Sequence, residues 1–258
     1  MAIALICGKK GRTYTAGLTL VELMVVVAMT ALLSALLLPA LSTAKERSRR
    51  AVCKSNIYQL FLAVNMYTEA DPNKDMPSCA DNKGYYHSII LSDSVFSNLV
   101  DLAGGNSNIF YCPNVVFGSG PSAVPQHIQN IGQVIGYSYL VANFNGSPKS
   151  PDYTVQPAKW PSSGTNELLA DANYWTPPGS GGSGPFPALM KVAPHTPMGA
   201  AMSQSSSFTV GLPGLSSASI GAVGGNIGFI DGHVDWLPLP RMQTNYASFP
   251  SDDAYGAW

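Results

Sequence analysis

The chain has 258 residues, of which 14 are basic and 15 acidic, so its formal net charge at neutral pH is −1. This balance provides no basic surface for nucleic acid, and we expect no nucleic-acid partner. Charged residues make up only 11% of the chain, whereas glycine and proline number 25 and 20. Such a weakly charged, loop-rich composition suits a packed subunit outside the cytoplasm better than a free cytosolic enzyme.

An apolar run occupies residues 18–41, and Glu22 is its only charged residue. As a helix this run would be about 36 Å long, which is enough to cross a hydrocarbon core of about 30 Å. Residues 1–17 contain three basic residues and no acidic one. The small residue that could mark a cleavage site, Gly17, precedes the run, so cleavage there would leave the run on the mature protein. We therefore expect a leader over 1–17 and a membrane helix over 18–41.

Glu22 is the anomaly of this apolar run. An unpaired carboxylate in hydrocarbon costs about 2.5–3.5 kcal/mol on insertion scales, so it requires a partner or a function. One interpretation is an ordinary single-pass anchor whose glutamate extends to the lipid headgroups. The other is a charge kept for pairing with a second chain.

The segment G-L-T-L-V-E from Gly17 to Glu22 resembles the type IV prepilin-like proteins, which include pilins and the pseudopilins of type II secretion. The resemblance implies that a prepilin peptidase cuts after Gly17 and methylates Leu18, which stands where phenylalanine is commonest in the family. It also implies that Glu22 neutralises the terminal ammonium of a neighbouring subunit. Pro39 lies where many pilins place a proline in their membrane helix.

The same resemblance implies the location and partners of the chain. We expect a single pass through the inner membrane with the C-terminal domain in the periplasm or otherwise extracytoplasmic. Basic residues flank both ends of the apolar run, so charge counting alone leaves this orientation open. The expected partners are the prepilin peptidase and other pilin or pseudopilin subunits in a homo- or hetero-filament.

The helix is expected to continue beyond the membrane, to about residue 67, with a kink near Pro39. Its second part, 42–69, carries apolar residues at the i, i+3, i+4, i+7 spacing of one helical face, namely Ile57, Leu60, Phe61, Val64 and Tyr67. This face predicts packing on a globular domain over 70–258. The fold class that we expect is α+β and pilin-like, a long helix on a small antiparallel sheet with long loops.

Within 70–258 the strongest local signal is Asp231-Gly232 between apolar flanks, which predicts a hairpin over 226–237 with positive φ at both turn positions. Other segments are predicted from turn and strand composition. They are a turn-rich stretch over 71–77, a short helix over 95–102 ended by Gly104 and Gly105, strands over 108–112, 135–144 and 167–172, and Gly/Ser-rich loops over 176–184 and 203–225.

A narrower resemblance rests on R-R-A-V-C-K-S-N-I-Y-Q-L from Arg49, Y-C-P-N at Tyr111, Y-S-Y-L at Tyr137 and N-I-G-F-I-D-G-H-V-D-W-L from Asn226. These segments look like a group of pseudopilin-like proteins abundant in Planctomycetes, Verrucomicrobia and Lentisphaerae. Members carry a histidine, nine residues and then Asp-Gly. Here Asp231-Gly232 matches, but Gly221 occupies the histidine position, and His195 is a candidate for a displaced equivalent.

Cysteine usage leaves several pairings open. Cys7 would leave with the leader, and Cys53, Cys79 and Cys112 permit one disulfide and one free thiol in three ways. Cys112 is expected in a core strand as a small buried hydrophobe. The spacing shows neither a CxxC pair nor a zinc set, so no bridge and no metal cofactor is predicted.

Three alternative functions compete with a structural subunit. A catalytic cluster could draw on Asp171, His195, Asp231, His233 and Asp235, but only if the fold brings them together. A turn role for Asp231 and solvent-facing positions for His233 and Asp235 explain these residues more simply. We therefore expect no enzyme.

Calcium could bind Asp71, Asn73 and Asp75, whose oxygens alternate as at the start of an EF-hand loop. Pro72 interrupts this spacing and the loop's glycine and final glutamate are missing, so a solvated turn is favoured.

The third alternative is a membrane-anchored module that binds glycan or protein and does not polymerise. It would use aromatic side chains in predicted loops, namely Tyr85, Tyr86, Trp160, Tyr174 and Trp175. Aromatic residues more often belong to a core, and the structural subunit is the favoured interpretation.

Overall fold

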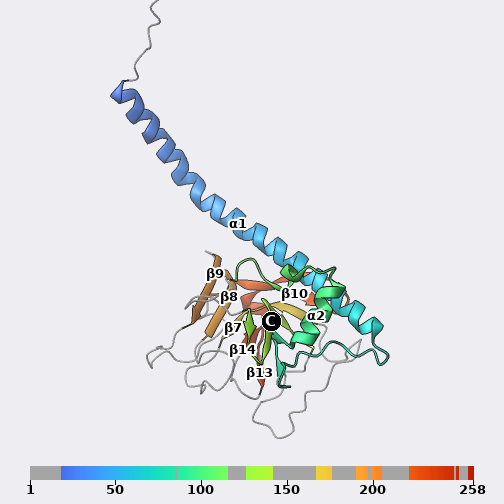
Figure 1. Ribbon diagram of the computed structural model, residues 1–258. Helices are drawn as coiled ribbons and strands as arrows, with labels where there is room; N and C mark the ends of the chain where they lie inside the picture. Colours follow the sequence, from blue (N-terminus) through green and yellow to red (C-terminus); the bar gives the residue numbers. More distant parts are fainter. Residues whose placement is uncertain are drawn as a thin grey trace, which may run out of the picture. The chain divides into compact units, whose positions relative to one another are not determined.

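The computed structural model describes residues 19–84, 86–115, 126–141, 167–175, 190–196, 199–204, 221–246, 248–249 and 255–258. The chain divides into two compact units, Met1–Ser42 and Thr43–Trp258. One helix, α1, spans Leu20–Ala70 and so contributes to both units, as Figure 1 shows in blue to cyan. The long N-terminal helix predicted from the sequence is confirmed over this range. We call residues 20–42 its apolar half and residues 43–70 its packed half.

The apolar half of α1 exposes apolar side chains on every side. Leu20 is 72% exposed and Leu36 is 77% exposed, and the intervening residues are exposed as well. A helix that is hydrophobic all round belongs in a membrane or in the core of an assembly. By length and composition this half can cross a membrane. The helix continues through Pro39, whose carbonyl accepts a hydrogen bond from Ser42 Oγ at 2.9 Å. The kink expected at Pro39 stays a prediction.

The packed half of α1 buries one face. The buried side chains recur at spacings of three and four residues, and they include Cys53, Ile57, Leu60, Phe61, Val64 and Thr68. Four of the five residues predicted to share an apolar face are therefore buried, and the fifth, Tyr67, is half-buried. The predicted packing of this half of the helix is confirmed.

A four-stranded antiparallel sheet lies against the packed half. Its strand order is β11 (Val234–Pro238), β10 (Gly224–Phe229), β6 (Glu167–Asp171) and β5 (Tyr137–Tyr139). The predicted strand over 167–172 and the predicted hairpin over 226–237 are confirmed. The strand predicted over 135–144 is three residues long in the described part, and residues 142–144 lie outside it.

A second antiparallel sheet is connected to the first where the chain passes from β6 to β7 (Tyr174–Trp175). Its order is β12 (Thr244–Tyr246), β14 (Tyr255–Ala257), β7, β8 (Met190–Thr196) and β9 (Gly199–Gln204). Residues 203–204 belong to β9 and 224–225 to β10, so both ends of the loop predicted over 203–225 are strand instead. Residues 205–220 and the loop predicted over 176–184 lie outside the described residues.

The remaining elements are short. They are β1 (Tyr86–His87) paired with β13 (Ser248–Phe249), a sheet of β2 (Ile90–Leu91), β4 (Gly132–Val134) and β3 (His127–Ile128), the helix α2 (Asp93–Leu102), and the 3₁₀ helices η1 (Ser107–Phe110) and η2 (Leu239–Arg241). Together with α1 and the two larger sheets they give an α+β fold.

One local prediction differs from the structure, and the start of another element is shifted. The segment 108–112 was predicted as a strand, but η1 takes its first part because Asn106 caps the turn by accepting the Asn108 N–H at 3.2 Å. The short helix predicted over 95–102 is confirmed as α2, and it begins two residues earlier because the Ser92 side chain accepts the Val95 N–H.

The hairpin turn is also wider than a two-residue turn. Phe229 O accepts the Gly232 N–H at 2.9 Å, and among the described residues 230–233 only Gly232 has a positive φ, of 90°. Asp231 therefore does not take the positive φ that the sequence predicted. A turn followed by a left-handed glycine is a usual alternative for hairpins, and it needs one such residue instead of two.

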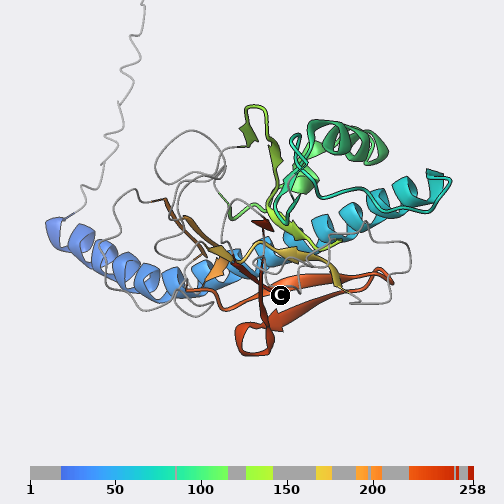
Figure 2. The same ribbon diagram turned by 90° about the horizontal axis from the view of Figure 1, so that it is seen from below.

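Glycine in β10 lets the sheet approach α1 closely. A Cβ atom at Gly228 would lie 2.5 Å from Ile57 Cγ2, and both residues are buried. In Figure 2 the red β10–β11 hairpin lies along the packed half of α1, in agreement with this contact. The missing side chain is thus what allows the helix to lie on the sheet.

This contact predicts a specific coupling between Gly228 and Ile57. Gly228→Ala should lower the free energy of unfolding by about 1–3 kcal/mol, since an added methyl group in a filled core forces its neighbours apart. In an Ile57→Ala background the same change should cost much less, because the new methyl group enters the space that Cγ2 leaves. Urea denaturation of the four proteins in detergent measures the coupling. Equal costs in both backgrounds would show that the helix does not pack on β10 at this point.

Candidate functional site

Thr19 and Glu22 form a reciprocal cap at the start of α1. Glu22 Oε2 accepts hydrogen bonds from Thr19 N and from Thr19 Oγ1, each at 2.8 Å, and Thr19 Oγ1 accepts the Glu22 N–H at 3.2 Å. The sequence T-L-V-E is the capping-box pattern, which satisfies backbone donors that a helix N-terminus otherwise leaves unpaired. The carboxylate also lies at the positive end of the helix dipole.

The structure describes two of the four N-terminal residues that were predicted to be functional, Glu22 and Pro39. Glu22 has a partner within its own chain, a role that the sequence interpretation did not include. Gly17 and Leu18, the predicted processing residues, lie outside the described residues, and Pro39 lies inside the apolar half of α1. Pairing of Glu22 with a neighbouring chain stays a prediction.

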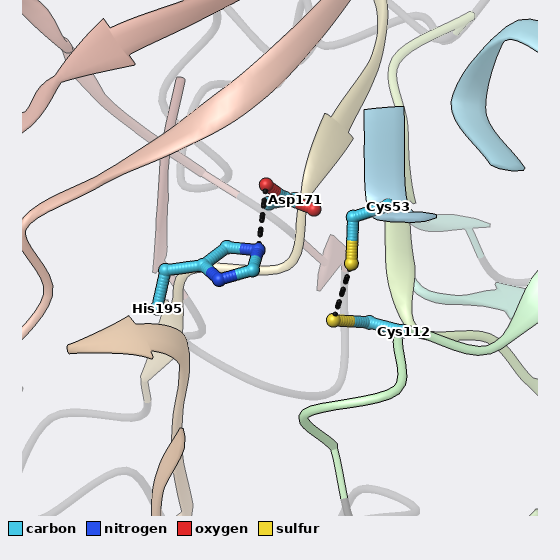
Figure 3. Close-up of side chains that lie close together, drawn as sticks. All are labelled: Cys53, Cys112, Asp171 and His195. Atoms are coloured by element: carbon cyan, nitrogen blue, oxygen red, sulfur yellow. Dashed lines mark hydrogen bonds and ion pairs between the residues drawn. The ribbon is translucent and has the colours of Figure 1, made fainter. Parts of the chain in front are cut away.

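A second group of polar residues is buried where α1 meets the two larger sheets. His195 Nδ1 lies 2.7 Å from Glu46 Oε1, and His195 Nε2 lies 3.2 Å from Asp171 Oδ2. His195 and Asp171 have no exposed surface, and Glu46 is 6% exposed. Figure 3 shows the imidazole directed at Asp171. We call Glu46, Arg50, Asp171 and His195 the ionic cluster.

The strand connections bring these residues together. Asp171 ends β6, and after two residues the chain enters β7 of the second sheet, so Asp171 lies where the two sheets meet. His195 belongs to β8 of that second sheet, and its carbonyl accepts the Val223 N–H at 3.0 Å, just before β10 of the first sheet begins. The backbone of His195 thus contacts Val223, which lies two positions after Gly221 in the sequence.

Each carboxylate of the ionic cluster has further donors. Asn114 Nδ2 donates to Glu46 Oε2 at 2.8 Å, and Arg50 Nε donates to Glu46 Oε1 at 3.0 Å. Asn226 donates to Asp171 Oδ2 through its backbone N at 2.6 Å and its side-chain amide at 2.9 Å. Since a buried charge is tolerated only when it is paired and hydrogen-bonded, these contacts explain how the core accommodates Glu46 and Asp171 Oδ2, whereas Asp171 Oδ1 has no hydrogen-bond partner among the described residues.

Arg50 reaches the cluster along an aromatic ring. Its guanidinium carbon lies 4.1 Å from the ring centroid of Trp236 in β11, and the same ring meets His195 edge-on at a centroid distance of 5.5 Å. A cation over an indole face is attracted by the ring's quadrupole. The ionic cluster is therefore enclosed by an aromatic side chain from the hairpin.

The electrostatics of the ionic cluster favour charged forms. Burial opposes the imidazolium, but the contacts with Asp171 and Cys53 outweigh it and raise the pKa of His195 to about 10. Burial likewise opposes the Glu46 carboxylate, but its hydrogen bonds with Asn114, His195 and Arg50 hold the Glu46 pKa below the usual range. At neutral pH an imidazolium at His195 thus faces the Glu46 carboxylate.

Two cysteines adjoin the cluster. Cys53 Sγ and Cys112 Sγ lie 2.8 Å apart, and both residues are buried. With Asp171 and His195 they place four possible metal-ligand atoms within 4.8 Å of one another. Thiolate, imidazole and carboxylate are ligands that zinc accepts in proteins. No spacing pattern in the sequence marks these four residues as a zinc set, because they are scattered over more than half of the chain.

Cys53, His195 and Asp171 also have the residue types of a nucleophile, a base and its orienting acid. All three side chains have no exposed surface, so no substrate reaches them in this conformation. Contact with Cys112, followed by burial, raises the pKa of the Cys53 thiol far above its usual range, which opposes the reactive thiolate. The geometry supports a structural role for these groups.

The other acid and imidazole candidates do not join this group. Asp231 and His233 contact each other in the hairpin turn, and both are largely exposed. Asp235 is exposed on β11. Of the five predicted catalytic candidates, the fold therefore brings together Asp171 and His195.

The predicted calcium ligands form a turn. Asp71 Oδ1 accepts the Asn73 N–H at 2.8 Å and the Asp75 N–H at 3.3 Å, as an aspartate does when it stabilises its own loop. This oxygen is used by the backbone, which agrees with the turn interpretation; calcium binding itself stays untested.

Five aromatic residues are candidates for binding sugar or protein. The side chains of four of them, Tyr85, Tyr86, Trp160 and Trp175, lie outside the described part of the structure. Tyr174 is described, and it is fully buried in the core. This residue cannot supply a stacking surface in this conformation.

Sequence reasoning missed Glu46, although a signal for it exists. Counting back from Ile57, the steps to Cys53, Arg50 and Glu46 are four, three and four residues, so Glu46 continues the buried stripe of α1. An acid in register with an apolar face predicts a buried partner. Nothing local in the sequence could identify that partner as His195, 149 residues away.

Comparison of the chain with protein-family models, with curated proteins and with solved structures found no match.

The raised pKa of His195 predicts a pH-dependent stability. The ordinary pKa of 6.5 rises to about 10 in the folded protein, so His195 stabilises the fold fully below pH 6.5, and this contribution is lost as the pH rises through about 10. His195→Gln should lower the free energy of unfolding by about 3 kcal/mol at pH 6 and by much less at pH 10.5. Urea denaturation in detergent at the two pH values measures both losses.

His233→Gln is the matched control for this experiment. His233 is exposed and pairs with Asp231 at the surface, so its replacement should change the free energy of unfolding by about 1 kcal/mol or less. If His195→Gln costs the same at pH 6 and at pH 10.5, then the imidazolium does not stabilise the core.

Proposed function

We propose that the chain is a structural subunit of a filament of the type IV pilus or type II secretion pseudopilus class. In this proposal a prepilin peptidase removes residues 1–17, residues 18–41 hold the subunit in the inner membrane, and the domain from residue 43 lies outside the cytoplasm. Subunits then leave the bilayer by bundling their apolar helices. The function is structural, and it resides in the polymer.

The observation that carries the proposal is the state of Glu22. It is the only charged residue of an apolar stretch that is otherwise exposed on every side, and it is fixed at the first turn of that stretch. A carboxylate accepts about four hydrogen bonds. Thr19 donates two of them, and both go to the same carboxylate oxygen, Glu22 Oε2. The side chain can therefore cap its own helix and still receive the ammonium group of a neighbouring chain.

The exposed apolar half supports assembly as well as anchoring. An apolar surface that surrounds a helix needs lipid or sister helices, and a bundle of such helices supplies the second. A lone anchor would satisfy the same apolar side chains, and in it Glu22 would serve only as the cap of its own helix. Assembly would also give the carboxylate charge a partner.

The domain from residue 43 supports a load-bearing role for the helix. The packed half of α1 is fixed by Ile57 against β10 and by the pair of Glu46 with His195, so the helix and the sheets form one body within this unit. A helix that is anchored on its sheet in this way would transmit force from a filament core to the domain it carries. The α+β layout agrees with the expected pilin-like fold.

The alternative of a module that binds glycan or protein without polymerising has weaker support. Of its five aromatic candidates, Tyr174 is the one with a described side chain, and that side chain is buried. Catalysis is disfavoured by the burial of Cys53, Asp171 and His195.

N-terminal mass spectrometry of protein from the native host tests the processing step. We expect a mature chain that begins with N-methylated Leu18. An intact leader, or a cut near Ala44 after the apolar run, would contradict the proposal. Deletion of the host's prepilin peptidase should restore the full-length chain, which controls for unrelated proteolysis.

Substitution of Glu22 tests assembly. Glu22→Ala should leave membrane insertion intact and abolish incorporation into filaments, because the terminal ammonium then loses its carboxylate. Glu22→Gln is the matched control, since glutamine also serves in a capping box but carries no charge. Membrane fractionation and immunogold labelling of sheared filaments measure the two steps. Wild-type incorporation of Glu22→Gln would restrict the carboxylate to helix capping and contradict charge pairing.

A further inference from the structure

Two cysteines that are 59 residues apart in sequence meet inside the domain. Cys53 belongs to the packed half of α1, and Cys112 follows η1. Their sulfur atoms lie 2.8 Å apart. Cys53 is 0% exposed and Cys112 is 1% exposed. Figure 3 shows the two side chains directed at each other from separate segments. The pair therefore links the helix to the loop that leads away from η1.

Both segments are held independently of the cysteines. The Gly136 N–H donates to Phe110 O at 2.8 Å, and a Cβ atom at Gly136 would lie 2.5 Å from Cys112 N, so the chain around Cys112 packs directly on backbone. On the helix side, Asn56 Nδ2 donates to Tyr111 O at 3.3 Å. The fold thus presents the two sulfur atoms to each other without help from a bond between them.

The separation of the sulfur atoms favours a covalent pair. Non-bonded carbon atoms prefer about 3.5–4.0 Å, and sulfur is larger than carbon. Two thiolates on one zinc ion, each at about 2.3 Å with tetrahedral angles, would lie about 3.8 Å apart. The observed 2.8 Å is shorter than either distance. Of the states open to two neighbouring cysteines, a disulfide requires the sulfur atoms to be closest.

The charge of the surroundings favours the same state. An imidazolium from His195 and the guanidinium of Arg50 already face the carboxylates of Glu46 and Asp171. A disulfide adds no charge to this buried set, whereas a metal site would require two buried thiolates next to Asp171.

We propose that Cys53 and Cys112 form a structural disulfide that ties the packed half of α1 to the domain. The two cysteine thiols lose two protons and two electrons. An oxidant that carries a disulfide accepts these protons and electrons, and its own disulfide becomes two thiols. In the cell the oxidant is a thiol–disulfide oxidoreductase of the extracytoplasmic compartment. Formation in the cell rests on the location given in the proposed function, whereas the pairing rests on geometry alone.

Peptide mapping of the purified full-length chain tests the pairing. The reduced protein, in detergent with a chelator, is equilibrated in a buffer of reduced and oxidised glutathione, alkylated and cut with trypsin. Its four cysteines fall in four separate tryptic peptides, 1–9, 51–54, 75–83 and 84–149. We expect 51–54 and 84–149 to be joined and the peptide of Cys79 to carry the alkyl label. Alkylation of both Cys53 and Cys112 after this oxidation would overturn the proposal.

Thermal unfolding provides a second measurement with matched controls. Reduction of the oxidised protein should lower Tm by about 10 °C, since the bridge closes a long loop in the unfolded chain. Cys79→Ala should keep this sensitivity to reductant, and Cys53→Ala and Cys112→Ala should lose it. A second arm adds Zn²⁺ to reduced protein. Retention of one zinc ion through gel filtration, with both thiols alkylated once the metal is chelated, would identify a metal site and overturn the disulfide.

The state in the native host separates this proposal from the proposed function. Acid quenching and alkylation of whole cells should also give the joined peptides. Reduced cysteines in cells, together with a bridge in glutathione buffer, would contradict the extracytoplasmic location and leave the pairing intact. A missing bridge in glutathione buffer would contradict the pairing and leave the location intact.

Discussion

The continuity of α1 across its apolar and packed halves is the constraint on which the rest of the molecule depends. A single helical register runs from Leu20 to Ala70. Its apolar half presents apolar side chains on all sides, and its packed half buries one face and exposes the other. Because an α-helix cannot change register without a break, the buried face of the packed half fixes where the sheets attach. Gly228 of β10 packs against that face at Ile57, and Glu46 extends from it to pair with His195.

The ionic cluster shows how a small core can include charges. Removing water from a carboxylate is costly, and the structure offsets this cost with an imidazolium, a guanidinium and the amide donors of Asn114 and Asn226. Glu46 comes from the helix, Asp171 from the first sheet and His195 from the second. Hydrophobic contacts between the same elements would tolerate several relative positions. Directional pairs with distances near 3 Å tolerate few, so the cluster specifies how helix and sheets meet as well as contributing to stability.

The sequence predicted those features that depend on local pattern. The length of α1, its buried face at Ile57, the helix α2 and the hairpin around Gly232 follow from periodicity and turn chemistry, and the structure confirms them. The 3₁₀ helix at 107–110 was missed because a capping asparagine outweighed strand propensity. The pairs of His195 with Glu46 and of Cys53 with Cys112 could not be predicted, since no spacing rule connects residues that only the strand order brings together. The cap of Glu22 on Thr19 was predictable in principle, because T-L-V-E is a local pattern.

The contact between Glu46 and His195 has a consequence for the order of events during synthesis. These residues are 149 positions apart, and Arg50 and Asn226, which also touch, are 176 apart. Contacts over such separations form late, because closing a long loop costs entropy that only the finished contact repays. The apolar half of α1 leaves the ribosome first, and its side chains are exposed in the folded chain. The packed half leaves the ribosome before Glu46 has its partner, because His195 belongs to β8, which is synthesised later. Arrival of the C-terminal strands is thus the step that commits the helix to its domain.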